Sequence, residues 1–267
     1  MATAQDSQGI QVLVRVRPPN EREKQLNRYC VDVDETKKAV ILSSRSDNKK
    51  SQFLYDQVSG KDGTQEHIFD CVGKPMCESV LKGYNATIFA YGQTGAGKTF
   101  TMMGSGDWGG NVPDDIVTDS RGLIQRVFDY LFLRIDEMQQ GEDNVEISCK
   151  CQYLEIYNEQ VTDLLADGAT GIIIRDDPKK GGVVIEGASY TPVKTSADTL
   201  AALSLGQMNR RVAATCMNKE SSRSHCVFTL YLQTTTVRDG ITTKRFSRFN
   251  LCDLAGSERQ KQVLLHI

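Results

Sequence analysis

Eight consecutive residues in the first half of the chain have the types and spacing needed to hold a polyphosphate. Gly92-Gln93-Thr94-Gly95-Ala96-Gly97-Lys98-Thr99 follows an apolar, β-rich run over 86–91. This is the G-x-x-x-x-G-K-[ST] pattern directly after a predicted strand, the context in which it forms a phosphate-binding loop. Its three glycines allow positive φ and bring successive N–H groups towards an anion. Lys98 supplies positive charge for the β- and γ-phosphates, and the Thr99 hydroxyl is a ligand suited to Mg²⁺. We therefore predict that the chain binds a nucleoside triphosphate.

Two later segments have residues that suit the same phosphates. Asn218-Lys219-Glu220-Ser221-Ser222-Arg223-Ser224-His225 concentrates hydroxyls and positive charge, although by itself it is equally compatible with a polar turn. Phe249 to Asp253 is an apolar run ending in an acid, followed by Leu254-Ala255-Gly256-Ser257-Glu258. An Asp at the end of a strand can supply the anionic partner of Mg²⁺, and a glycine after it leaves a backbone N–H for the γ-phosphate. By itself, a strand that ends in an exposed Asp is common in α/β folds. Taken together, the three segments predict a γ-phosphate sensor.

The periodicity of apolar residues predicts the elements that position these segments. We expect strands over 10–17, 86–91, 145–157, 225–235 and 244–252, short β-like pieces over 29–33, 39–42 and 53–55, and a hairpin of 172–175 with 183–186. Helices are expected over 64–81, 123–138 and 196–213, with Thr64 and Ser196 as N-caps. Strands that alternate with helices, with a phosphate loop at the end of one strand, predict a three-layer α/β/α domain.

A long polar segment over 104–122 separates the phosphate loop from the next predicted helix and contains the only tryptophan, Trp108. Loops of this length in a compact domain are usually functional or disordered. A mobile surface loop accounts for most of these residues. The alternative is that Trp108 covers a pocket beside the nucleotide.

Composition narrows the class of protein. The 267 residues are 39% hydrophobic and 25% charged, which is typical of a soluble globular chain. No apolar run approaches the roughly 20 residues that span a bilayer, and the N-terminus lacks the features of a secretory signal, so no membrane partner is expected. The net charge of −2 argues against a general polyanion binder, so no nucleic-acid partner is expected. The eight cysteines include no CxxC pair, which favours free thiols in a reducing cytosol over disulfides or zinc.

On these segments the chain strongly resembles the kinesin motor domain. The resemblance rests on 88–99, 218–225 and 253–258, on Arg15-Val16-Arg17-Pro18 and on Leu154-Glu155-Ile156-Tyr157-Asn158-Glu159, and it covers 10–261. Met102-Met103-Gly104, Cys149-Lys150-Cys151 and Arg259-Gln260-Lys261 are most similar to the spindle-associated kinesin-12 class. The resemblance implies a kinesin-type P-loop NTPase fold with a central mixed sheet, and an ATPase that moves on microtubules in the cytoplasm, with the spindle as one location.

The resemblance also implies a role for each matching residue, with ATP and Mg²⁺ as cofactors. Arg15 and Pro18 would flank the adenine, and the loop from Gly92 to Thr99 would wrap the phosphates. The magnesium site would be Thr99 and Ser222, with Asp253 reaching the ion through water. The Gly256 amide would sense the γ-phosphate, Arg223 would pair with Glu258, and Glu258 with Ser221 and Ser222 would orient the attacking water.

The end of the chain departs from the family pattern. Gln262-Val263-Leu264-Leu265-His266-Ile267 does not resemble the family's continuation into the relay helix, the main microtubule-binding helices and the neck linker. We therefore expect a flexible N-terminus over 1–9, a partial motor domain over 10–261 that is C-terminally incomplete, and a divergent tail over 262–267. Any oligomer would form through a coiled coil outside this sequence.

Three functions are compatible with this sequence. The first is a microtubule motor ATPase, for which Lys179-Lys180 resembles a microtubule-facing loop but equally suits a solvated turn. The second is a GTPase, which would need Asn-Lys-x-Asp, whereas Asn218-Lys219-Glu220-Ser221 ends in serine. The third is a non-motile fragment that binds nucleotide or a partner.

Overall fold

A computed structural model describes residues 9–26, 29–44, 49–105, 120–141, 144–166, 171–177, 182–217 and 221–258 of the chain, without the side chains of 213–221. Contacts divide it into two compact units, Met1–Cys71 and Val72–Ile267. Trp108, the Lys179-Lys180 turn, Asn218 to Glu220 and the tail over 262–267 lie outside the described residues. The predictions made for them stay predictions.

The N-terminal unit consists of small sheets and short helices. Its elements are β1 (Leu13–Arg15), α1 (Glu21–Leu26), β2 (Val31–Asp34), β3 (Ala39–Ser43), β4 (Lys50–Leu54), β5 (Gln57–Ser59) and α2 (Gln65–Ile68). β1 pairs with β5 in parallel, and β2, β3 and β4 form an antiparallel meander. The strand predicted over 10–17 is shorter than expected, because its pairing with β5 extends over only three residues.

The helix predicted over 64–81 is present, but it is not uniform. Thr64 is its N-cap as predicted, because the Thr64 hydroxyl accepts a hydrogen bond from the His67 N–H. After α2 the chain forms a π-helical turn, η1 (Phe69–Gly73), and then the α-helix α3 (Lys74–Leu81). Apolar periodicity alone does not distinguish these helix types.

The second unit is organised around a mixed sheet. Its elements after α3 are β6 (Ala86–Ala90), α4 (Lys98–Met103), α5 (Leu123–Gly141), β7 (Val145–Tyr157), β8 (Gln160–Asp163), β9 (Ile173–Asp177), β10 (Gly182–Glu186), β11 (Thr191–Val193), α6 (Ser196–Met217), the 3₁₀ helix η4 (Ser221–Arg223), β12 (His225–Arg238) and β13 (Ile241–Asp253). The strand order is β11-β7-β12-β13-β6, with β8 on β7. β12 is antiparallel to both neighbours and β13 is parallel to β6. The predicted α/β class with a central mixed sheet is confirmed.

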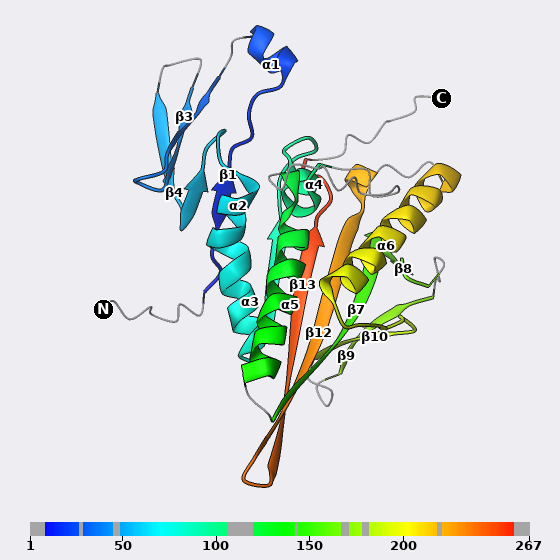
Figure 1. Cartoon of the computed structure of the whole chain (residues 1–267). Helices are drawn as coiled ribbons and strands as arrows, with labels where there is room; N and C mark the ends of the chain where they lie inside the picture. Colours follow the sequence, from blue (N-terminus) through cyan, green and yellow to red (C-terminus); the bar gives the residue numbers. More distant parts are fainter. Residues whose placement is uncertain are drawn as a thin grey trace. The chain divides into compact units, whose positions relative to one another are not determined.

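The core of this unit lies between the sheet and its helices. Phe228 of β12 is fully buried and its ring packs on those of Phe128 in α5 and Tyr153 in β7. Among the described residues of this unit, α3, α4, α5 and α6 lie on this face of the sheet and supply one of the predicted helical layers (Figure 1). By register the opposite face includes Phe89, Phe246 and Arg248.

Two hairpins complete this unit. The predicted pairing of 172–175 with 183–186 is confirmed by β9 and β10. β12 and β13 are longer than predicted and run past the helices to a shared turn (Figure 1). That turn is Asp239-Gly240, with φ of 51° and 76°. An Asp-Gly pair between two β runs is a strong hairpin signal, which the strand ends predicted from periodicity did not take into account.

The predicted cap of α6 is wrong by one residue. Thr195 is the cap, since its hydroxyl accepts from the Asp198 N–H at 3.1 Å while the Asp198 carboxylate accepts from the N–H groups of Lys194 and Thr195. Ser196 instead donates to Asp129 of α5. The reciprocal bonding of Thr195 and Asp198 is a capping box, which a single neighbouring serine cannot match.

The two ends of the segment over 104–122, predicted as a long polar insertion, are hydrogen-bonded to each other. α4 ends at Gly104, which forms an isolated bridge with Arg121, and the Ser105 N–H donates to the Ser120 carbonyl at 3.1 Å. A Cβ on Gly122 would lie 2.3 Å from the Gly104 nitrogen. The ends of α4 and α5 therefore meet backbone to backbone, where a side chain does not fit.

Helix α6 approaches the sheet closely at Gly206. A Cβ at this position would lie 2.2 Å from Cδ1 of the buried Tyr153 ring. We expect Gly206→Ala to lower the free energy of unfolding by about 1–3 kcal/mol because of overpacking, despite the higher helix propensity of alanine. Urea denaturation of the full chain measures this change. Gly141→Ala in α5, where no atom lies within 4 Å, should leave stability unchanged or slightly higher. Equal stability of the two variants would contradict the packing argument.

Candidate phosphate-binding site

The predicted phosphate loop has the conformation that its glycines allow. β6 ends at Ala90, and α4 begins at Lys98 with Gly97 as its N-cap residue. The three loop glycines all have positive φ: 153° at Gly92, 78° at Gly95 and 96° at Gly97. The expected strand, glycine turn and helix are therefore present in order, and the loop enters α4 directly at Lys98.

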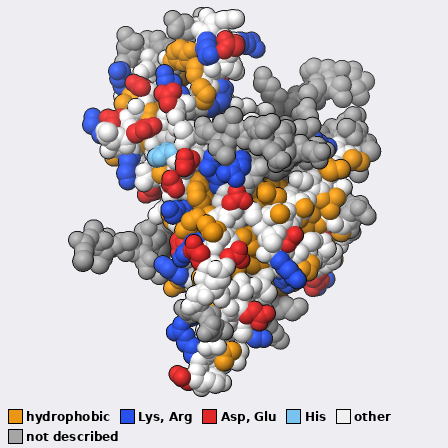
Figure 2. Space-filling view, in the orientation of Figure 1, with side chains coloured by type: hydrophobic (Ala, Val, Ile, Leu, Met, Phe, Trp, Pro, Cys, Tyr) orange, Lys and Arg blue, Asp and Glu red, His pale blue; other side chains and the backbone are white. Residues whose placement is uncertain are grey.

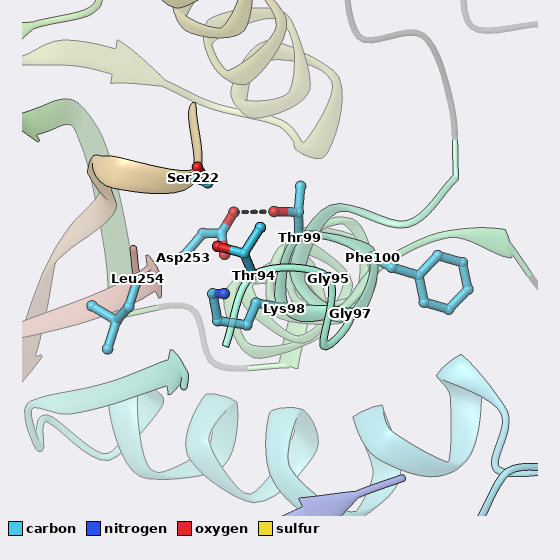
Figure 3. A pocket seen from close by; sticks show the side chains of 9 residues that line it. All are labelled: Thr94, Gly95, Gly97, Lys98, Thr99, Phe100, Ser222, Asp253 and Leu254. Atoms are coloured by element: carbon cyan, nitrogen blue, oxygen red, sulfur yellow. Dashed lines mark hydrogen bonds between the residues drawn. The ribbon is translucent and has the colours of Figure 1, made fainter. Parts of the chain in front are cut away.

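The three predicted segments line a common pocket of about 300 Å³ (Figure 3). The phosphate loop and α4 contribute one wall, η4 contributes Ser222, and the end of β13 contributes the remainder. The lining residues are Thr94, Gly95, Gly97, Lys98, Thr99, Phe100, Ser222, Asp253 and Leu254. The ring of Phe100 points away from Lys98 and Asp253 in this view (Figure 3). Segments more than 120 residues apart in the sequence thus meet at one site, as the sequence predicted.

Lys98 is held at the loop by backbone oxygens. Its ammonium group donates to the carbonyls of Gly92 at 2.9 Å and Gln93 at 3.0 Å. These contacts keep the positive charge at the mouth of the loop, beside the N-terminus of α4. A phosphate bound there would meet both the ammonium group and the loop N–H groups.

Asp253 is the acid of this pocket and is only 8% exposed. Its Oδ2 accepts a hydrogen bond from the Thr99 hydroxyl at 2.7 Å, whereas Oδ1 is buried and has no hydrogen-bond partner among the described residues. Burial raises the pKa of Asp253, and the Thr99 hydrogen bond and the charges of Arg210 and Lys98 oppose that rise. A buried carboxylate oxygen without a partner is costly. A cation or a cation-bound water next to Oδ1 would remove that cost.

The residues present fit Mg²⁺ bound together with a phosphate. Mg²⁺ prefers oxygen ligands, keeps several waters and is usually held by one or two protein groups and substrate phosphates. Thr99, Ser222 and Asp253 offer two hydroxyls and a carboxylate at one pocket. In the described part of the chain no three His, Cys, Asp or Glu side chains gather into a metal site. Phosphate oxygens would therefore complete the coordination.

The segment after β13 is bonded to both other segments. The Gly256 N–H donates to the Ser222 carbonyl at 2.8 Å, and the Ser257 N–H donates to the Gly92 carbonyl at 3.0 Å. Glu258 accepts from the backbone N–H of Thr94 at 2.8 Å and from the Thr94 hydroxyl. These hydrogen bonds lower the pKa of Glu258. The Glu258 carboxylate thus lies on the phosphate loop, and its predicted ion pair with Arg223 stays a prediction.

Gly256 sits where a side chain would collide. A Cβ there would lie 2.5 Å from both carboxylate oxygens of Glu258 and from the Thr94 hydroxyl. Glycine at this position is therefore a requirement of the Thr94–Glu258 contact. This contact was not predicted, because it joins residues 164 positions apart.

Further residues of the predicted site are placed as follows. Ser221 and Arg223 form η4 with Ser222, and the role predicted for the Ser221 side chain stays a prediction. His225, which was given no separate role, accepts at Nδ1 from the Ala255 N–H at 3.0 Å. It joins the start of β12 to the segment after β13. In the sequence, only the serine- and glycine-rich composition of these two loops indicated that they lie close together in space.

The residues predicted to flank adenine belong to the N-terminal unit. Arg15 donates to the Gln65 side chain at 2.8 Å and to the Gly63 carbonyl at 3.1 Å. Pro18 is exposed and its carbonyl accepts from Arg17. All three hydrogen bonds lie within that unit, and the predicted adenine site stays a prediction.

The described cysteines are free, as predicted. All seven lack a disulfide partner, and Cys77, Cys149, Cys151, Cys226 and Cys252 are substantially shielded. Burial raises the pKa of the Cys151 and Cys226 thiols to about 12. These thiols are therefore protonated and unreactive at neutral pH.

The mixed sheet, the glycine loop and the pocket at its edge define the class of P-loop NTPase folds. A family model described as the kinesin motor domain matches residues 15–264. The chain is 45% identical over 256 residues to the kinesin-like protein KIN-12E of Oryza sativa subsp. japonica, a match that covers 94% of this chain and 13% of that protein. It is 44% identical over 262 residues to the kinesin-like protein KIF15 of Mus musculus, over 97% of this chain and 18% of that protein.

A solved structure described as "Structure of a fast kinesin: Implications for ATPase mechanism and interactions with microtubules" matches with a TM-score of 0.84 and 34% identity, over 95% of this chain and 67% of that one. The chain belongs to the kinesin motor domain family. The resemblance to the kinesin-12 class is also confirmed. The chain spans less than a fifth of the length of the curated relatives named above.

Proposed function

We propose that this chain binds and hydrolyses Mg²⁺-ATP and couples hydrolysis to microtubule binding and movement. The observation that carries the proposal is the pocket at which Lys98, Thr99, Ser222 and Asp253 meet from three separate segments. Membership of the kinesin motor domain family supports ATP over GTP as the nucleotide.

Each side chain in the pocket has a task suited to phosphoryl transfer. The loop N–H groups and Lys98 bind and orient the phosphates, Thr99 and Ser222 hold Mg²⁺, and Asp253 holds one of its waters. Bound Mg²⁺ neutralises charge that develops on the phosphate oxygens. The Gly256 N–H reaches the γ-phosphate, and Glu258 with Ser221 and Ser222 orients the attacking water. Catalysis by positioning and charge neutralisation is what this reaction requires.

Microtubules are the proposed partner, in the cytoplasm and on the spindle. Interactions with microtubules are described for the fast kinesin whose solved structure matches this chain. On the face drawn in Figure 2, Lys and Arg side chains are intermixed with Asp and Glu over the described residues. This mixed distribution argues against general polyanion binding. In the part of the chain described, no helix has the length and apolar character to cross a bilayer.

Nucleotide-dependent co-sedimentation tests this function. We expect the purified chain to pellet with microtubules several-fold more with a non-hydrolysable ATP analogue and Mg²⁺ than with ADP. The γ-phosphate would bind beside the Ser222 and Gly256 segments, which are hydrogen-bonded to each other, and change the microtubule-binding state. Equal pelleting with both nucleotides would contradict a motor function of this chain. Equal pelleting together with ATP binding would identify a non-motile nucleotide-binding fragment.

A further inference from the structure

The outer face of helix α6 is apolar, which is unusual for a helix on the surface of a protein. Leu205, Met208 and Val212 are 45%, 47% and 62% exposed, and Ala201 is exposed as well. No charged residue occurs over 199–209. Surface helices normally carry charged and polar side chains on the face turned to solvent. The outer face of α6 therefore has the composition of a contact surface.

The exposed apolar side chains form one stripe along the helix, which we call the α6 seam. Its members are separated by four, three and four residues: Ala201, Leu205, Met208 and Val212. This is the spacing of the a and d positions of a heptad, through which two helices pack knobs into holes. The side of α6 turned to the sheet is marked by the buried Leu203 and by Arg210, which is 9% exposed and hydrogen-bonded to Glu155 of β7. In Figure 2 hydrophobic side chains gather over α6, whose place Figure 1 gives.

The spacing of the seam makes it complementary to a second copy of itself. The order of four, three and four residues is unchanged when the helix is reversed about the midpoint between Gly206 and Gln207. An antiparallel second copy would therefore place its Met208 opposite Leu205 and its Val212 opposite Ala201. A contact that uses the same patch on both copies closes as a twofold dimer, the commonest symmetry of soluble oligomers.

The charges at the two ends of the seam also suit an antiparallel second copy. Asp198 and Arg211 are exposed, and they are the charged residues beside the seam in the described part of α6. In the antiparallel arrangement Arg211 lies opposite position 202 of the second copy, about one helical turn from its Asp198. A parallel arrangement would bring the two Arg211 side chains to the same end, far from either Asp198. Opposite charges thus meet in the first arrangement and not in the second.

We propose that the α6 seam is the contact through which two copies of this chain associate, with their α6 helices antiparallel. A seam of four side chains per copy is at the low end of the area that specific interfaces bury, so the dimer is weak, with a Kd of about 10–100 μM. The inference does not depend on the proposed function, because no residue of the seam lines the phosphate pocket.

Sedimentation velocity of the full chain, from about 2 to about 200 μM, tests this contact. The mass of the native chain should rise from that of one chain towards that of two. Leu205→Glu alone and Met208→Lys alone should each weaken association at least about tenfold, because each places a charge against an apolar side chain. An equimolar mixture of the two variants should regain native association. The antiparallel contact sets the new carboxylate against the new ammonium group and keeps the other three layers native.

Ile241→Glu is the matched control, since it makes the same kind of change at an apolar side chain that is 69% exposed on β13. It should associate as the native chain does, and all variants should retain native circular dichroism. A native chain that stays monomeric to about 200 μM would overturn the inference and leave the seam to a different helical partner. Undiminished association of Leu205→Glu would also overturn it. A mixture that associates no better than its two components would exclude the antiparallel contact.

Discussion

Replacing Lys98 by alanine is expected to abolish nucleotide binding. Lys98 carries the positive charge at the mouth of the loop, where its ammonium group lies within 3.0 Å of two loop carbonyls. Removing a charge that meets phosphate in a partly enclosed site costs at least about 2.7 kcal/mol, and we therefore expect affinity for ATP to fall by about 100-fold or more. Equilibrium titration with a fluorescent ATP analogue measures the loss.

The control for this variant is Lys244→Ala on the exposed part of β13, which removes the same charge away from the pocket. It should bind nucleotide as the native chain does, and both variants should retain native circular dichroism. If Lys98→Ala kept native affinity, the phosphate-loop assignment would be wrong and the pocket would need another ligand.

Gly256→Ala is expected to separate nucleotide binding from hydrolysis. The new methyl group would lie 2.5 Å from Glu258 and from the Thr94 hydroxyl, and both are side-chain ends that can move away. The fold should therefore survive, while Glu258 leaves the phosphate loop and the backbone N–H of position 256, which alanine retains, is displaced from the γ-phosphate. Loss of one preorganised donor typically costs 100- to 1,000-fold in rate, and we expect at least about 100-fold here.

Single-turnover hydrolysis, measured beside the equilibrium affinity for ATP, tests this separation. Affinity should change by less than about threefold, since Lys98 and the loop N–H groups remain. Gly141→Ala, a glycine-to-alanine change in open space on α5, should hydrolyse ATP at the native rate. Native hydrolysis by Gly256→Ala would exclude a role of this segment in catalysis.

The three segments that line the pocket could be identified in the sequence because the pattern of each is local. The order of strand, glycine loop and Lys-Thr is contained in 86–99. Asp253 follows one strand that periodicity identifies, and Ser222 lies three residues before another. Their convergence on one pocket follows from strand order. The Thr94–Glu258 contact could not be predicted, because Glu258 lies in a loop with no periodicity of its own.

Arg210 shows a second limit of sequence reasoning. In the sequence it is one of two adjacent arginines on a predicted helix, and a charged residue there is normally solvated. Its burial depends on Glu155, 55 residues earlier, and on Ser224, which follows the helix. Only the strand register that aligns Glu155, Cys226 and Asp253 reveals why a cation is needed at that position.

Four short elements, α1, β5, β8 and β11, were not predicted, and the other errors in the fold concern the ends and the fine structure of elements. The prediction of Thr64 as a cap is confirmed, whereas the prediction of Ser196 did not consider Thr195, although Asp198 stands three residues after it. The π-helical turn at Phe69–Gly73 continues the apolar face of the helix, so the spacing of apolar residues does not distinguish it from an α-helix. In each case the alternative caps or helix types differ little in local free energy, so tertiary contacts determine which one forms.

The backbone bridge between Gly104 and Arg121 has a practical consequence for protein engineering. The bridge and the Ser105–Ser120 hydrogen bond hold the two ends of the intervening segment together. The entropy cost of closing such a loop rises only slowly with its length. A reporter peptide grafted between them should leave α4 and α5 undisturbed. The bridge itself lies a few residues after Phe100 of the nucleotide pocket, so a probe attached at Ser105 would be near the chemistry without replacing a residue that performs it.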